Sequence, residues 1–197
     1  MEAIRTFTSA ALPWPGVNCD TDQIIPARYL QKPRSDNFGD FLFSDLRFDE
    51  KGAEVKTFVL NQAPYRDARI VVAARNFGCG SSREHAVWAL YDYGFRAVVA
   101  PSLGDIFTIN CLKNGVVPVI LPEAVIHGLL DRLAAQPGAQ LTVDLPAERV
   151  LLPDGKEHAF AIDPFAKECL VNGIDELGYT LSLSDAITDY EARIARG

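Results

Sequence analysis

The sequence predicts an α/β fold with a parallel core sheet, crossover helices and a smaller set of short strands. Short continuous apolar runs recur along residues 69–135, and segments with helical apolar spacing alternate with them. This alternation is typical of a parallel sheet, because each helix returns the chain to the same end of the sheet. In addition, the turn signal Pro153-Asp154-Gly155 within residues 140–162 indicates two or three short strands there.

The βαβαβ core at 69–135 is expected to contain three strands and three helices. The strands are expected at Arg69–Ala74, Ala97–Ala100 and Val116–Leu121. The helices are expected at Ser82–Tyr93, Leu103–Leu112 and Pro122–Ala135. Pro118 in the third strand favours an edge position or a bulge, because proline lacks the N–H that a central strand uses.

The two ends of the chain differ from this core. Residues 1–50 are expected to form an irregular N-terminal arm that packs down, since it carries an aromatic cluster of Phe38, Phe41, Phe43 and Phe48. The C-terminal segment predicts helices at Asp163–Val171 and Ser184–Ala195. The length of 197 residues suits a single domain over 1–197.

Composition excludes several classes of function. The formal net charge of -7 argues against nucleic acid as a partner. The apolar runs are too short to cross a membrane, and no export signal is visible, so we expect a cytoplasmic protein. The four cysteines and three histidines are widely separated, with no C-x-x-C pair, so we expect no metal held by this chain alone.

The segment from Asn76 to Ala86, NFGCGSSREHA, follows the first core strand and enters a helix. Ligands in such folds gather at the carboxyl ends of the parallel strands. Gly78 and Gly80 permit positive φ and a close approach of the backbone to a ligand. The helix N-terminus and the guanidinium of Arg83 favour an anion. The loop therefore predicts a site for a carboxylate or phosphate, in a field that would also stabilise an alkoxide at Ser81.

A plainer interpretation of the same loop is a helix start capped by serine. It is a poor dinucleotide fingerprint, because no third glycine follows the G-x-G, and no Walker lysine follows the loop. From the residues alone, the capped helix and the anion site stay about equally well supported.

The literal string adds to this reading. GSSREHA after a strand resembles the swivel domain of the aconitase superfamily, and the longer run through VWAL and DYGF resembles the bacterial small subunits of 3-isopropylmalate dehydratase. The likeness extends to Asp20–Pro26 (DTDQIIP), to Gly104–Phe107 (GDIF), and to Asn172-Gly173 with Asp175. It spans nearly the whole chain and implies a swivelling β/β/α domain of the aconitase type.

The resemblance also implies that two chains together form the active site. In this family a large subunit holds a [4Fe–4S] cluster, and the small subunit docks over it. The reaction removes water from a hydroxy-dicarboxylate and returns it at the neighbouring carbon, so that 2-isopropylmalate becomes 3-isopropylmalate in leucine biosynthesis. We therefore expect a hydro-lyase subunit that binds no cofactor itself and is active only with the large subunit.

The same resemblance implies roles for individual residues. Ser81 matches the catalytic base, Arg83 the group that grips a substrate carboxylate, and Ser82 a neighbouring hydrogen-bond donor. Asp22 matches an aspartate of the T-D-x-I motif that lines the site. Gly78 and Gly80 shape the loop backbone. A second substrate-gripping arginine is expected after that motif, with Arg28 and Arg34 as the candidates.

Two alternatives stay open. The chain could serve a related hydro-lyase for another small hydroxy-dicarboxylate, of the citraconate, dimethylmalate or homoaconitate type, because apolar pockets separate similar alkyl groups weakly. It could also be a non-catalytic anion-binding module. The combination of Ser81, Ser82, Arg83 and Asp22 argues against that module, because binding alone needs no serine base.

Overall fold

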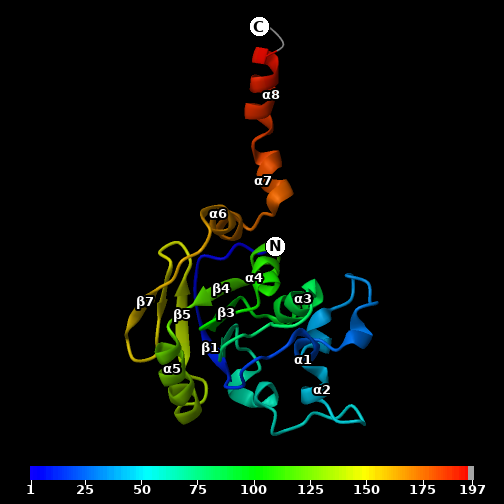
Figure 1. The fold of residues 1–197 in the computed structure, drawn as a ribbon, viewed down its shortest axis with the longest axis vertical. Coiled ribbons are helices and arrows are strands. Elements are labelled where there is room, and N and C mark those ends of the chain that lie inside the picture. Colours follow the sequence, from blue (N-terminus) through cyan, green and yellow to red (C-terminus); the bar gives the residue numbers. More distant parts are fainter. Residues whose placement is uncertain (195–197) are drawn as a thin grey trace.

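The computed structural model describes residues 1–194, and a mixed β-sheet lies at its centre (Figure 1). Within these residues the strands follow the spatial order β4-β3-β2-β1-β5-β6-β7. Their bounds are β1 Thr6–Trp14, β2 Ile70–Ala73, β3 Ala97–Ala100, β4 Val117–Ile120, β5 Gln140–Asp144, β6 Arg149–Leu151 and β7 Glu157–Ala159. Strands β1 to β4 run parallel, whereas β5, β6 and β7 extend the sheet from β1 in antiparallel pairs. The predicted α/β class, with its parallel core and added short strands, is confirmed.

Strand β1 corrects the expectation of an irregular arm over residues 1–50. Its nine residues lie in the middle of the sheet, where Ala11 to Trp14 pair with β2 and Thr6 to Ala10 pair with β5. Residue propensities do not predict this strand, because alanine, serine and proline are poor strand formers. Pro13 is tolerated because it lies in the half of β1 that pairs only with β2.

The predicted core elements are all present, with ends that differ by at most two residues. The helices are α3 Glu84–Tyr93, α4 Asp105–Lys113 and α5 Glu123–Ala135. Strand β4, which contains Pro118, lies at an edge of the sheet as predicted. Every residue of β2 and β3 is buried, because helices cover both faces of this half of the sheet.

Alternate residues of the parallel strands pack into two separate cores. Val71 and Val98 lie in one core with residues of α3 and α4, whereas Val72 and Val99 lie in the other with residues of α5. Successive side chains of a strand point to opposite faces, so two adjacent valines serve two different helical layers.

Short helical turns fill the segment between β1 and β2. They are α1 Thr21–Ile24, η1 Ala27–Tyr29, η2 Phe38–Phe41, α2 Ser44–Arg47, η3 Val59–Asn61 and η4 Ala63–Tyr65, where η marks a 3-10 helix. The aromatic residues of this segment pack down as predicted: Phe38 and Phe43 are fully buried, and Phe43 stacks on Trp14 with ring centroids 4.8 Å apart.

The chain ends in three helices that differ in how they are held. Helix α6 (Pro164–Asn172) packs on the body, whereas α7 (Glu176–Ser182) and α8 (Ser184–Ile194) project away from it (Figure 1). We call α7 and α8 the C-terminal arm. Helices α6 and α8 match the predicted helices, although Ala195, the predicted end of the last one, lies outside the described residues. The sequence did not predict α7. Within residues 1–194, no helix is both long and apolar enough to cross a membrane.

Candidate active site

The candidate site is the loop from Asn76 to Arg83, which leaves the carboxyl end of β2. Phe77 forms a parallel bridge with Leu103, just beyond the end of β3, so the loop lies where two neighbouring parallel strands end. Gly104 also donates a backbone hydrogen bond to the Phe77 carbonyl at 2.9 Å. The loop therefore lies at the carboxyl edge of the sheet, as predicted.

Gly78 is required here for two physical reasons. Its φ is +73°, a conformation that L side chains rarely adopt, and a Cβ at this position would overlap the ring of Phe107 in α4. Gly104 has a similar role from the other side, because a Cβ there would lie 2.5 Å from the Gly78 carbonyl oxygen. Gly78, Gly104 and Phe107 are closely packed, so the loop backbone lies against the start of α4.

The N-terminal T-D motif forms the second support of the loop. The backbone N–H groups of Gly78 and Cys79 donate to the Cys19 carbonyl at 2.7 and 3.2 Å, and the Thr21 N–H donates to the Cys79 carbonyl at 2.9 Å. Asp20 caps α1 by accepting from the Gln23 N–H at 2.8 Å. Segments sixty residues apart in sequence thus form one bonded unit.

Ser81 lies in this unit with its hydroxyl uncommitted to the helix. The Thr21 hydroxyl donates to the Ser81 carbonyl at 3.0 Å, and the Thr21 Oγ1 and Ser81 Oγ atoms are 3.5 Å apart. Thr21 is buried, whereas Ser81 and Ser82 are exposed. Sequence reasoning passed over Thr21 as a site residue, although it stands between Asp20 and Asp22 in the quoted motif.

The alternative interpretation, a helix capped by a serine side chain, is wrong. Helix α3 begins at Glu84 instead of the predicted Ser82, and its N-cap residue is Arg83, with no side-chain hydrogen bond to the helix. Neither Ser81 nor Ser82 therefore caps the helix, and the plainer interpretation of the serines loses its support.

Arg83 and Asp22 face each other across the loop. The Arg83 Nη1 donates to the Asp22 carboxylate, and the exposed fractions of the two side chains are 18% and 54%. The guanidinium is thus mostly enclosed, while its carboxylate partner is accessible to solvent. The T-D motif thus contacts both ends of the Ser81–Arg83 segment, Thr21 at Ser81 and Asp22 at Arg83.

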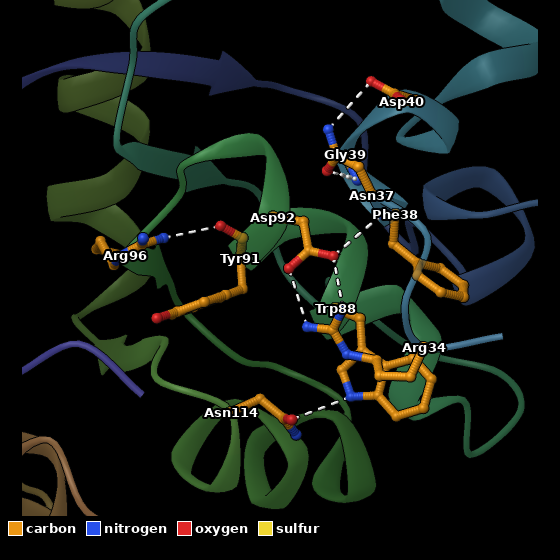
Figure 2. Close-up of polar contacts among 10 residues, drawn as sticks. All are labelled: Arg34, Asn37, Phe38, Gly39, Asp40, Trp88, Tyr91, Asp92, Arg96 and Asn114. Atoms are coloured by element: carbon orange, nitrogen blue, oxygen red, sulfur yellow. Dashed lines mark hydrogen bonds and ion pairs between the residues drawn. The ribbon is translucent and has the colours of Figure 1, made fainter.

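The two other candidate arginines are held by carboxylates elsewhere. Arg28 pairs with Asp45 of α2. Arg34 makes a two-pronged pair with Asp92 of α3, at 2.8 and 2.9 Å, and its guanidinium lies over Trp88 (Figure 2). Asp92 lies nine residues beyond Arg83, or about 13 Å along a helix. In this structure Arg34 anchors the segment after Leu30 to α3 and does not face Ser81.

Helix α3 is anchored along its length by polar contacts on that face. The Asp92 carboxylate also accepts from the Phe38 N–H at 3.1 Å, and the Trp88 indole N–H donates to Asn114 at 3.0 Å (Figure 2). Asn114 in turn donates to Glu84 at 2.9 Å. These contacts hold the helix that carries Arg83 at its start.

His85 packs between aromatic rings of the same region. Its ring centroid lies 4.5 Å from Trp88 and 5.6 Å from Phe38. Burial lowers the pKa of His85 below its usual value, which favours the neutral ring. These contacts support a structural role for this member of the motif.

The four cysteines do not form a cluster site. All four are free thiols, and Cys19, Cys111 and Cys169 are buried. Burial raises the pKa of each of these three thiols, which disfavours the thiolate that ligates metals. Among residues 1–194, no three His, Cys, Asp or Glu side chains are grouped so that they could hold a metal ion. The cysteines of this region therefore do not form a ligand set that fits an iron–sulfur cluster.

Comparison with protein families gives two matches. The family model described as "Aconitase C-terminal domain" matches residues 1–124, and the model described as "LeuD_N" matches residues 128–164. The first match includes β1, the T-D motif, the loop and Arg83, and so covers every element of the candidate site.

Curated relatives extend the likeness to the full length of the chain. A 3-isopropylmalate dehydratase small subunit from Rhodospirillum centenum is 52% identical over 98% of this chain and 95% of the relative. Small subunits of the same name from Magnetococcus marinus and a Ruegeria species are each 46% identical, over 98% and 100% of this chain and 95% and 98% of the relatives. The crystal structure of a 3-isopropylmalate dehydratase chain from Methanocaldococcus jannaschii has the same fold, with a TM-score of 0.66 at 24% identity, over 94% of this chain and 99% of that one.

Proposed function

Because this chain belongs to the family of 3-isopropylmalate dehydratase small subunits, we propose that it supplies the proton-transfer and carboxylate-binding groups of that hydro-lyase. The observation that carries the proposal is the exposure of Ser81 and the contacts that hold it. Its side chain is exposed and does not cap α3, and its Oγ lies 3.5 Å from the Thr21 Oγ1, two residues before the Arg83 that pairs with Asp22.

Ser81 is the proposed base. A serine hydroxyl is a very weak acid, so its alkoxide needs nearby donors and positive charge. The Arg83 guanidinium and the positive end of the α3 dipole can supply these, and the Thr21 hydroxyl adds a donor when it turns from the Ser81 carbonyl to the Ser81 Oγ. The alkoxide takes a proton from one substrate carbon, the C–H electron pair forms the double bond, and hydroxide leaves the neighbouring carbon. Return of water with the carbons exchanged gives the isomer.

Arg83 is the proposed grip on a substrate carboxylate. Its planar fork suits two-pronged binding of a carboxylate, and its low exposure strengthens that interaction. Asp22 occupies one nitrogen of the fork and orients it, and the Ser82 hydroxyl offers a further donor to the substrate. Gly78 and Gly80 keep the backbone in the conformation that presents these groups together.

The remaining parts of the reaction are assigned to the partner. We propose that the large subunit holds the [4Fe–4S] cluster, since the cysteines among residues 1–194 do not form a ligand set that fits one. The substrate is then bound between two chains, and either chain alone is inactive. The substrate is 2-isopropylmalate, in leucine biosynthesis, and the expected cytoplasmic location follows from that pathway.

Reconstitution tests the proposal. The chain is mixed anaerobically with its large subunit carrying an intact cluster, and dehydration of 3-isopropylmalate is compared with citramalate, dimethylmalate and homocitrate-type acids. Ser81→Ala should lower turnover about a thousandfold while leaving assembly unchanged. Ser82→Ala is the matched control and should cost about tenfold. Unchanged turnover in Ser81→Ala would remove the role of Ser81, and a preference for another acid would reassign the substrate.

A further inference from the structure

The C-terminal arm carries a stripe of apolar side chains (Leu177, Leu181, Leu183, Ile187, Tyr190 and Ile194) that stay exposed among residues 1–194. Large apolar side chains on α7 and α8 are highly exposed, with fractions of 65% for Leu177, 62% for Leu181, 54% for Tyr190 and 60% for Ile194. No residue of either helix is buried. Contiguous exposed apolar surface of this kind is typical of an interaction site.

The stripe has the spacing of a helix face that binds a partner. Ile187, Tyr190 and Ile194 are three and four residues apart, so they align along one side of α8, and Leu183, directly before α8, continues the spacing. Helix α8 has 11 residues, and isolated helices of that length are marginal in water. Its stability therefore depends on a surface that residues 1–194 do not provide.

Only the base of the arm is anchored to the body. Tyr179 of α7 packs edge-on against Phe165 of α6 with centroids 4.8 Å apart, and Glu176 pairs with Lys113 of α4 at 3.3 Å. Between α4, α6 and α7 lies an open hollow of about 450 Å³, lined mostly by apolar side chains that include Ile109 and Leu177. The hollow joins the stripe to the body.

Helix α4 connects this surface to the candidate site. Ile106 and Ile109 lie one turn apart on α4 and are about half exposed. Their neighbour Phe107 packs against Phe77 and beneath Gly78 in the active-site loop, whereas Lys113, at the other end of α4, contacts α7. Apolar surface thus runs from the loop over α4 to the arm.

We propose that the large subunit binds this surface, and that the C-terminal arm is its main docking element. The proposal rests on the proposed function, because the large subunit must cover the loop at one end of α4 and can continue along the same face. Charge disfavours a second copy as the occupant. Residues 175–194 contain five acidic residues and one basic residue, so two arms would repel each other. The binding groove on the large subunit is therefore apolar with basic edges.

Substitution on the stripe tests this docking. Ile187→Asp places a charge in the stripe, and Thr188→Asp places the same charge on another side of α8. The dissociation constant between each variant and the cluster-loaded large subunit is measured by titration, with circular dichroism to verify the fold. Ile187→Asp should weaken binding at least tenfold, whereas Thr188→Asp should change it less than about threefold. Turnover of Ile187→Asp should recover at saturating large subunit.

The outcomes separate this inference from the function of the loop. Loss of turnover in Ser81→Ala with normal assembly concerns only the loop, and loss of assembly in Ile187→Asp with recoverable turnover supports docking through the arm. Unchanged affinity in Ile187→Asp overturns the proposal. Loss of self-association by the free chain in that variant, with normal binding to the large subunit, would instead assign the stripe to a second copy.

Discussion

The tip of the candidate-site loop (Gly80 to Ser82) and the C-terminal arm are both exposed, yet the chain supports the loop far more than the arm. The loop is bonded to the T-D motif, to the segment after β3 and to α3, and Phe107 packs beneath it. The arm has no buried residue and is anchored only at its base. The candidate site is thus positioned by contacts within the chain, whereas the arm has few such contacts, and our proposal assigns its covering to the large subunit.

The largest expected loss of stability comes from disturbing the packing that supports the loop. Gly78→Ala should lower the free energy of unfolding by about 4 kcal/mol, because the new methyl overlaps Phe107 and the backbone keeps a positive φ. Gly155→Ala is the matched control, since its φ is +82° with open space around it, and it should cost about 1 kcal/mol. Urea denaturation measures both. Equal costs would mean that the loop yields easily and is not locked.

Truncation of a leucine should lower the free energy of unfolding more in α3, the helix that follows the loop, than in the arm. Leu90→Ala in α3 removes a fully buried side chain and should cost about 3 kcal/mol of unfolding free energy. Leu181→Ala in the arm makes the same chemical change at a side chain that is 62% exposed, and should cost less than about 0.5 kcal/mol in the free chain. Thermal and urea unfolding of the free chain give both values. A large cost at Leu181 would show that the arm packs on the body.

The smallest expected effect is a pH dependence centred on His85. Burial lowers its pKa, so the unfolded chain binds more protons at this group than the folded chain. The stability that depends on the neutral ring is complete above about pH 6.5 and is lost as pH falls from there through the lower folded pKa. Melting temperatures between pH 7.5 and 5.5 should fall less in His85→Gln than in the native chain.

Sequence reasoning succeeded where local signals and tertiary packing agree. The runs that became β2, β3 and β4 are short and apolar with helices between them, and a strand buried on both faces has that composition. It failed at β1, where Ser9, Ala10 and Pro13 give weak local signals and pairing with β2 and β5 decides the conformation. It also passed over α7, which is short and has no buried face.

For the candidate site, the sequence by itself determined which groups are available: Ser81, Ser82, Arg83 and Asp22, with glycines at 78 and 80. Only the tertiary structure decided how they are used. Pairing of the T-D motif with the loop brings Asp22 to Arg83 and buried Thr21 to Ser81, contacts that span sixty residues of sequence. Packing likewise decided that Arg28 pairs with Asp45 and Arg34 with Asp92. A sequence lists donors and acceptors, but their partners depend on which distant segments pack together, because each charged group can satisfy only the neighbours within its reach.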